Sequence, residues 1–379
     1  MEFIKKFFYN TNNLNTIAII GDTILKSNCE EVHPFSYEIS KFLKTIPCTV
    51  LNLETVLSSN EEFKEKAVSL STNPENVKYL KEIGVKAVNL ANNHVFDQGL
   101  EGYLLTLTTL ESAGVSFFGV LQQGKQPPYI VEFDGLRIGF LGYSIESNEK
   151  PEGIPPLEIS SIREDVKSLK NKNIEKIIVN LHWGEEYVPF PSNKQQKMAR
   201  SIIELGVDVI IGHHPHVVQG VEEYRQGVIF YSIGNFNFPT FGNFSGTRWG
   251  LIVLLKFEEL KTYYSFLPVK IDSKFRPYFP PEEYCELFRN YISRISLVLK
   301  PNISSSFWFK EAAIPHFSNH IPSFILRIKK YGFKHFLLMV RWLLSPSNYK
   351  YYLGLFFKLF DQEVEIRFPF SNDQDNSYP

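Results

Sequence analysis

Short apolar runs alternate with amphipathic stretches from residue 16 to residue 258, and this alternation predicts strands and helices in turn. The runs expected to form strands cover 16–20, 48–53, 85–90, 115–120, 129–133, 136–142, 176–181, 207–211, 227–232 and 250–257. Helical periodicity covers 73–83, 100–112, 160–170 and 193–205. Asp134-Gly135 lies between two of the apolar runs and indicates a hairpin. The pattern is typical of a layered α/β fold.

The chain changes character after residue 258. Aromatic and basic helical segments are expected at 282–299, 323–344 and 349–360, where glycine is scarce. We therefore predict two domains, an α/β domain over 16–258 and an aromatic-rich, mainly helical C-terminal extension over 259–379. Packing of these helices on the α/β domain is one interpretation. The other is contact with a partner or peripheral contact with a membrane, because basic residues beside aromatic helices suit the headgroup boundary of a bilayer.

Composition excludes some classes of function. The formal net charge of −1 gives no general attraction to nucleic acid, so we expect no nucleic-acid partner. Three cysteines without CxxC spacing indicate neither a disulfide framework nor a thiolate zinc site. The N-terminal stretch lacks the pattern of a signal peptide, and no run of uncharged apolar residues is long enough to span a bilayer. We therefore expect a cytoplasmic protein, with peripheral contact to the inner membrane face as the alternative.

Five of the predicted strands end in side chains that can bind metal ions. Carboxyl ends of strands are where open α/β sheets place their active sites. The side chains at these ends are Asp22, Glu54, Asn93 with His94, His182, and His213 with His216. Mixed oxygen and nitrogen donors suit Mn, Fe, Co or Zn better than calcium, and six ligands exceed the needs of one tetrahedral ion. We therefore predict one or two divalent metal ions that activate water, with His94 placed to protonate a leaving group or to bind an oxyanion.

The motifs around these residues resemble those of the CapA (PgsA) family, which is linked to poly-γ-glutamate capsule synthesis within the calcineurin-like metallophosphoesterase superfamily. The matching motifs are Gly21-Asp22, Asn52-Leu53-Glu54, Ala91-Asn92-Asn93-His94, His182-Trp183-Gly184, Gly212-His213-His214-Pro215-His216 with Gln219, and Ser232-Ile233-Gly234-Asn235-Phe236. The resemblance implies a four-layer sandwich of two β-sheets flanked by helices. It also implies metal ligands at Asp22, Glu54, Asn93, His182, His213 and His216, a catalytic histidine at His94, and no ligand role for His214.

Two departures from the wider superfamily bear on the chemistry. The first motif of most members is Asp-x-His, whereas Thr23 and Ile24 follow Asp22 here. Glu54 occupies the position at which most members have an Asp that bridges two metal ions. The resemblance therefore supports the scaffold more strongly than it supports a simple phosphatase activity. Similar motifs occur in peptide epimerases, which implies that such a site can also act at a peptide carbon.

Several of these residues have simpler interpretations. Gly21-Asp22 and Asn93 suit turns, and Glu54 suits the first turn of a helix. Trp183, Glu185 and Glu186 either shape a substrate pocket or begin a loop, and Asn235 either positions the ligand loops or contacts substrate. Four other histidines have no comparable neighbours in sequence and are interpreted as structural or solvated: His33, His316, His320 and His335.

The first functional hypothesis is a metal-dependent hydrolase of the CapA type that acts on an anionic small-molecule or polymer substrate in capsule or cell-envelope polymer synthesis. A second keeps the site and changes the reaction to amide hydrolysis, ligation or epimerisation on a peptide or γ-glutamyl substrate. A third is a non-catalytic component of a membrane-associated capsule synthase complex.

Overall fold

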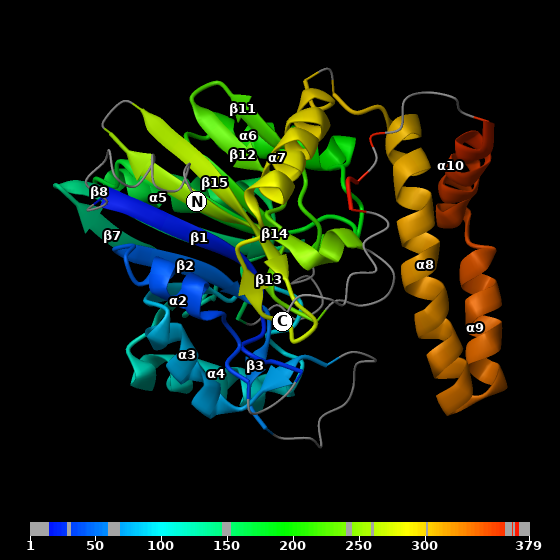
Figure 1. The fold of residues 1–379 in the computed structure, drawn as a ribbon, viewed down its shortest axis with the longest axis horizontal. Coiled ribbons are helices and arrows are strands. Elements are labelled where there is room, and N and C mark those ends of the chain that lie inside the picture. The colour runs from blue at the N-terminus through cyan, green and yellow to red at the C-terminus, as the bar shows by residue number, and fades with distance from the viewer. Residues whose placement is uncertain are drawn as a thin grey trace.

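Two β-sheets pack face to face in the protein, whose structure is a computed structural model (Figure 1). It describes residues 15–28, 32–59, 69–145, 153–239, 245–258, 261–300, 302–360, 366 and 368–370. The first sheet contains β1 (Thr16–Thr23), β2 (Cys48–Leu53), β5 (Val85–Asn89), β6 (Ser116–Phe118), β13 (Asn235–Asn237), β14 (Trp249–Phe257), β15 (Thr262–Ile271) and β16 (Pro277–Tyr278). The second contains β7 (Tyr129–Phe133), β8 (Leu136–Ser144), β9 (Lys176–His182), β10 (Val209–His213), β11 (Val221–Tyr224) and β12 (Gly227–Phe230).

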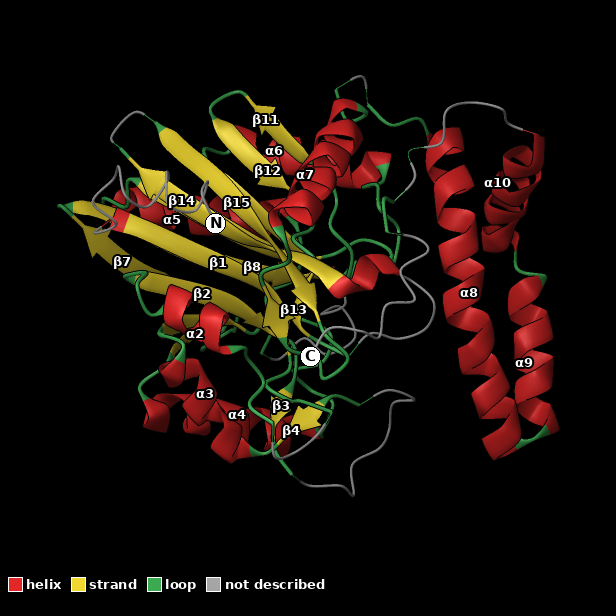
Figure 2. Ribbon diagram, in the orientation of Figure 1, coloured by secondary structure: helices red, strands yellow, loops and turns green. Residues whose placement is uncertain are grey.

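The strand order of the first sheet is β16-β15-β14-β1-β2-β5-β6, with β13 also paired to β1, and that of the second is β11-β12-β10-β9-β8-β7. A separate two-stranded sheet joins β3 (Val56–Leu57) to β4 (Ser71–Thr72). The helices are α2 (Tyr37–Leu43), α3 (Val77–Glu82), α4 (Gly99–Ala113), α5 (Ile159–Asn171), α6 (Asn193–Glu204), α7 (Glu282–Leu297), α8 (Ser305–Tyr331), α9 (Phe333–Leu343) and α10 (Tyr349–Phe360) (Figure 2).

The central strands are apolar on both faces, which explains their uninterrupted hydrophobic runs. Along β1, Ile17 and Ile19 belong to the core between the sheets, whereas Ala18 and Ile20 belong to the core under α2, α3 and α4. Residues of α5 and α6 cover the second sheet. The predicted α/β sandwich of two sheets flanked by helices, followed by a helical C-terminal region, is confirmed.

Parallel pairing aligns the strand ends on which the site was predicted. In the first sheet β1 pairs parallel with β2, and β2 with β5. In the second sheet β9 pairs parallel with both β8 and β10. Parallel strands end at the same edge of a sheet, so the polar residues that follow them come together there.

The first sheet continues past residue 258. β15 pairs antiparallel with β14 from Trp249↔Lys270 to Phe257↔Thr262. The boundary predicted at 258 therefore falls within a continuous strand pair, and the division into two domains stays a prediction.

Helices α8, α9 and α10, coloured gold to red, stand together to one side of the sheets (Figure 1). The helix predicted at 323–344 is two helices and begins much earlier. The Ser304 side chain caps α8 by accepting from the Phe307 backbone N–H, and α8 runs through Pro315 and Pro322 to Gly332, whose φ is 78°. Trp308 Nε1 donates to the Phe190 backbone oxygen at 2.9 Å, which fixes the start of α8 on the α/β sandwich. Among the described residues, no helix combines the length and the hydropathy needed to cross a membrane.

Candidate metal centre

The predicted site residues meet at the carboxyl ends of five strands. Asp22 lies near the end of β1, Glu54 directly follows β2, and His182 and His213 are the last residues of β9 and β10. Asn93 and His94 lie on the turn after β5, and His216 lies on the loop after β10. All of them are buried except Asn93, which is half-buried.

Glu54 occupies the middle of this group. Its Oε1 lies 3.7 Å from His182 Nε2, 3.8 Å from His216 Nε2 and 3.9 Å from His94 Nε2. These separations are too long for hydrogen bonds. Neither carboxylate oxygen has a hydrogen-bond partner among the residues that the structure describes, although the side chain is fully buried. Buried carboxylates are normally satisfied, so this arrangement fits a cation about 2.0–2.2 Å from each ligand atom.

Asp22 is held by several donors. Its Oδ1 accepts from Asn52 Nδ2 at 2.9 Å, and its Oδ2 accepts from the His214 backbone N–H at 3.3 Å. His213 Nδ1 lies 3.1 Å from Oδ1, and His216 Nδ1 lies 3.4 Å from Oδ2. Asp22 is thus rigidly positioned, with His216 between it and Glu54.

The two carboxylates have opposite electrostatic environments. Burial and then the negative charge of Asp22 raise the pKa of Glu54 well above its usual range. Burial also opposes ionisation of Asp22, but hydrogen bonds with His213 and His216 outweigh it and hold its pKa well below the usual range. Burial and the neighbouring His214 lower the pKa of His182, which favours the neutral ring that metal ions bind.

His94 is oriented by a residue that sequence reasoning missed. His94 Nδ1 lies 2.6 Å from Asp97 Oδ2, which also accepts from the Leu70 backbone N–H at 2.7 Å. The Nε2 of His94 therefore faces Glu54. A carboxylate three residues after a predicted catalytic histidine was the available signal, but only the turn after β5 brings the two side chains together.

The remaining predicted ligands divide into two subsets. Asn93 Oδ1 lies 2.9 Å from His182 Nε2, on the Glu54 side of the site. His213 lies on the Asp22 side, and its Nε2 is 3.3 Å from Asn180 Oδ1. The structure does not bring His213 into contact with Glu54 in the way that it brings His182 and His216.

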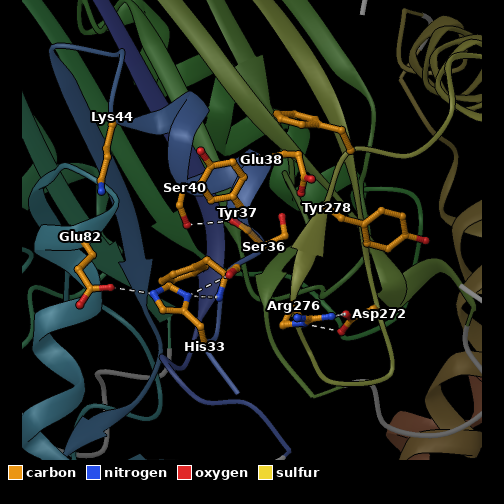
Figure 3. Close-up of a pocket in the computed structure, with 12 residues that line it drawn as sticks. His33, Ser36, Tyr37, Glu38, Ser40, Lys44, Glu82, Asp272, Arg276 and Tyr278 are labelled. Carbon is orange, nitrogen blue, oxygen red and sulfur yellow. Dashed lines mark hydrogen bonds and ion pairs between the residues drawn. The ribbon is translucent and has the colours of Figure 1, made fainter. Parts of the chain in front are cut away.

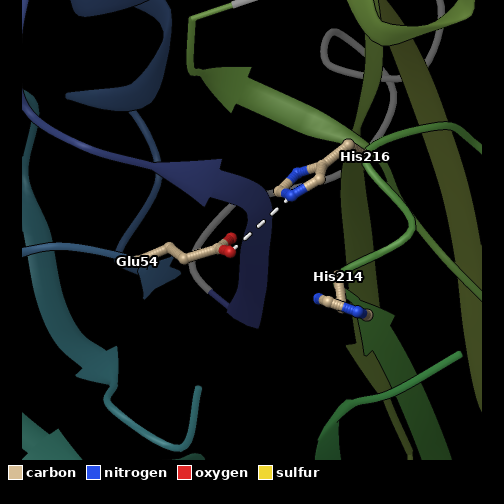
Figure 4. A group of neighbouring side chains, drawn as sticks. All are labelled: Glu54, His214 and His216. Carbon is tan, nitrogen blue, oxygen red and sulfur yellow. Dashed lines mark ion pairs between the residues drawn. The ribbon is translucent and has the colours of Figure 1, made fainter. Parts of the chain in front are cut away.

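His214, to which no ligand role was assigned, also lies in the group. A ring nitrogen of His214, one of His216 and a carboxylate oxygen of Glu54 all lie within 4.8 Å of one another (Figure 4). Both histidines have positive φ, 94° for His214 and 55° for His216. This unusual backbone turns both rings toward Glu54, which a sequence pattern alone does not reveal.

Two residues with alternative interpretations now have defined surroundings. Trp183 is buried, and its Nε1 donates to the Tyr231 backbone oxygen at 3.0 Å, so it is part of the core. His216 Nδ1 lies 2.9 Å from Asn235 Oδ1, which agrees with a positioning role for Asn235.

A surface cavity of about 720 Å³ lies elsewhere, between α2, α3 and β16 (Figure 3). None of the predicted site residues lines it. Two pairs of side chains line it, with His33 Nε2 2.8 Å from Glu82 Oε2 and Arg276 Nη2 2.8 Å from Asp272 Oδ2. This cavity is therefore separate from the strand-end residues.

Comparison with known proteins agrees with the motif resemblance. The family model described as "Bacterial capsule synthesis protein PGA_cap" matches residues 16–240. The chain belongs to this family. It is 32% identical over 260 residues to the capsule biosynthesis protein CapA of Bacillus anthracis, covering 62% of this chain and 63% of that protein. It is also 32% identical over 198 residues to the PGA biosynthesis protein CapA of Bacillus subtilis (strain 168), covering 49% of this chain and 52% of that protein.

The chain thus spans less than two thirds of the length of these curated CapA relatives. Solved structures similar to it include a 5'-nucleotidase precursor from Thermus thermophilus, with a TM-score of 0.45, 13% identity, and coverage of 80% of this chain and 68% of that one. The NAD nucleotidase of Haemophilus influenzae matches with a TM-score of 0.43 and 16% identity, over 72% of this chain and 54% of that one. These likenesses are too weak to indicate an activity.

Proposed function

We propose that this CapA-family chain is a metal-dependent hydrolase that acts on an anionic substrate in capsule or cell-envelope polymer synthesis, of the poly-γ-glutamate kind. The observation that carries the proposal is the buried Glu54 carboxylate, which has no hydrogen-bond partner among the described residues and faces three imidazole Nε2 atoms. Such a carboxylate costs stability unless a cation compensates it, so its presence favours a metal-binding role.

The ligand set would comprise Asp22, Glu54, Asn93, His182, His213 and His216, holding one or two divalent ions such as Mn, Fe, Zn or Co. A bound ion of this type supplies an activated water and stabilises developing negative charge. His94 would donate a proton to the leaving group, with Asp97 holding its ring in place. Asn52 and the His214 backbone N–H would keep Asp22 oriented.

Removal of the metal should abolish hydrolysis. We expect protein treated with a chelator to lose at least about 100-fold in its rate on an aryl phosphate ester and to recover on addition of Mn²⁺, because water activation depends on the ion. His213→Ala should weaken Mn²⁺ binding roughly 10- to 100-fold, because it removes a proposed ligand that also orients Asp22. Metal content by mass spectrometry and the hydrolysis rate are the measurements. Undiminished activity at zero metal content would refute the proposal.

A second reaction class follows from the kind of polymer named in the relatives. One relative is named a PGA biosynthesis protein, and another, from Mycobacterium tuberculosis, a probable polyglutamine synthesis accessory protein. A glutamate polymer is joined by amide bonds, so the same site could act on a γ-glutamyl or other peptide by hydrolysis, ligation or epimerisation. Product mass separates the reactions, since hydrolysis adds one water, ligation removes one, and epimerisation leaves the mass unchanged.

A non-enzymatic role, as a component of a membrane-associated capsule synthase, would not require the metal ligands or His94 for capsule formation. In that case His94→Ala and His182→Ala would leave capsule formation intact in cells. Loss of capsule in both variants, with the protein still folded, would favour the enzymatic proposals.

The helical extension also suits an anionic membrane surface, and we propose that it docks there. Residues 305–360 contain six lysines and two arginines but only one acidic residue, Glu311, whereas the whole chain has a net charge of −1. Large apolar side chains are exposed on the same helices, including Phe333 (70%), Phe356 (56%) and Leu337 (54%). Exposed aromatic residues beside basic ones match the headgroup boundary of a bilayer. A cytoplasmic location, with this contact on the inner membrane face, stays a prediction.

Charge reversal on the extension should therefore reduce membrane binding. Arg327→Glu, Lys329→Glu and Lys334→Glu together should lower flotation with phosphatidylserine vesicles at least about ten-fold, since each basic residue near such a surface contributes about 1 kcal/mol. The matched control reverses three exposed lysines in or directly after α2 and α3: Lys41, Lys44 and Lys81. Equal flotation of the two triple variants would contradict membrane docking. Self-association of the wild type through this face, without flotation, would assign the face to a second copy instead.

A further inference from the structure

Three metal-competent side chains outside the centre at Glu54 come together where α8 passes the loop after β9. His316 and His320 are four residues apart on α8 and therefore lie on the same face of the helix. Glu185 lies on the loop, three residues after His182. One ligand atom from each of the three lies within 4.8 Å of the others.

The protons on His316 limit what can lie between it and Glu185. Asn348 Nδ2 donates to the Trp342 backbone oxygen at 2.8 Å, so Asn348 Oδ1 is left as an acceptor for His316 Nε2 at 3.0 Å. The Nε2 atom of His316 therefore carries a hydrogen. The other nitrogen, Nδ1, lies 2.8 Å from Glu185 Oε1.

A neutral His316 would thus direct a lone pair at a carboxylate oxygen, which is repulsive. Either a proton, carried by the ring or by the carboxyl group, or a metal ion bound by both must therefore lie between the two atoms. The Nε2–H bond to Asn348 is the outer contact expected for a metal-bound histidine, whose free N–H is usually held by an oxygen acceptor.

The second histidine favours the metal ion. The ring of His320 lies 4.6 Å from the ring of His316, between centroids, and one of its nitrogens lies within 4.8 Å of a ligand atom of His316 and of Glu185. His320 therefore offers a third ligand atom, which an ion pair between His316 and Glu185 alone would not use. His316 is buried, and His320 is half-buried, so the group remains accessible to an exchanging ion.

We propose that Glu185, His316 and His320 form a further cation site, which takes a zinc-type divalent ion and fastens α8 to the loop that follows His182. Two imidazoles and one carboxylate are a ligand set that zinc uses in proteins, with water in the fourth position. Two histidines spaced i, i+4 on one helix are a spacing that zinc-binding helices use. The site would connect the helical extension to the loop that directly follows His182, a residue of the Glu54 centre.

The test uses the full chain, stripped of metal and titrated with Zn²⁺ alone. His320→Gln and Glu185→Gln should each lose one equivalent of bound Zn²⁺, or weaken it at least ten-fold, and should reduce the rise in melting temperature that Zn²⁺ causes. His335→Gln, which alters a histidine on the adjacent helix α9, is the matched control and should bind as the wild type does.

The Glu54→Gln variant distinguishes this site from the centre of the proposed function. It should lose the ions bound at the strand ends and keep the one equivalent of Zn²⁺ that His320→Gln loses. If His320→Gln, Glu185→Gln and the wild type bind the same number of Zn²⁺ ions with equal affinity, the site does not exist. His316 and Glu185 would then be an ion pair only.

Discussion

Replacing Glu54 with Gln should weaken divalent-ion binding by at least about 100-fold and should not lower the melting temperature of the metal-free protein. The loss of affinity is expected because removing one partner from a buried pair of opposite charges costs about 3–5 kcal/mol. Stability should be retained because neither Glu54 oxygen has a hydrogen-bond partner among the described residues to lose. Calorimetric titration with Mn²⁺ and thermal unfolding after chelation measure the two effects.

Glu222→Gln provides the matched control. Glu222 is also a buried glutamate, but it accepts from Arg200 Nε at 2.8 Å and from the Tyr231 hydroxyl at 2.7 Å. This variant should lose stability and keep its Mn²⁺ affinity, the reverse of Glu54→Gln. If both variants lose stability and both keep their affinity, Glu54 is a structural residue.

Replacing His94 with Ala should lower kcat/KM roughly 10²- to 10⁴-fold while bound metal is retained, because general acid catalysis contributes about that much. Asp97→Asn should cause a smaller loss of roughly 10- to 100-fold, since Asp97 only orients the ring. Initial rates on an aryl phosphate ester, together with metal content, measure both variants.

His33→Ala is the control for the loss of a histidine that is paired with a carboxylate. His33 Nε2 lies 2.8 Å from Glu82 Oε2, but the pair lines the separate surface cavity. The His33→Ala variant should therefore be as active as the wild type. Full activity in His94→Ala would remove His94 from the mechanism.

The α/β sandwich could be predicted because its strands are buried on both faces and read as uninterrupted apolar runs. β15 was missed because its residues are only partly buried at the start and include Pro268, and proline demotes a strand prediction. α8 was predicted to begin too late, because Pro315 and Pro322 read as helix breakers. Contacts with Phe190 and α10 stabilise α8 beyond these prolines. Such contacts cannot be predicted from the local sequence.

The site was predicted as a set of residues but not as a geometry. Strand ends indicated that Asp22, Glu54 and His182 would meet, and the structure places their ligand atoms within 4.8 Å of one another. The inclusion of His214 depends on the positive φ angles of the loop after β10, and the role of Asp97 depends on the turn after β5. Neither conformation can be inferred from residue type and spacing.

The same limit explains why His316 and His320 were interpreted as structural. Four-residue spacing on a helix indicates a shared face, but a third ligand from a distant loop decides whether that face binds metal. Glu185 supplies that ligand only because α8 packs beside the loop after β9.

The central claim, that the strand-end residues hold a divalent ion at Glu54, is tested most directly by a crystal structure of protein soaked in Mn²⁺, with anomalous scattering recorded to locate the ion. We predict an anomalous peak about 2.0–2.2 Å from a Glu54 carboxylate oxygen and from the Nε2 atom of His182 or His216. The absence of any peak beside Glu54, at a Mn²⁺ concentration that occupies other sites in the crystal, would contradict the account.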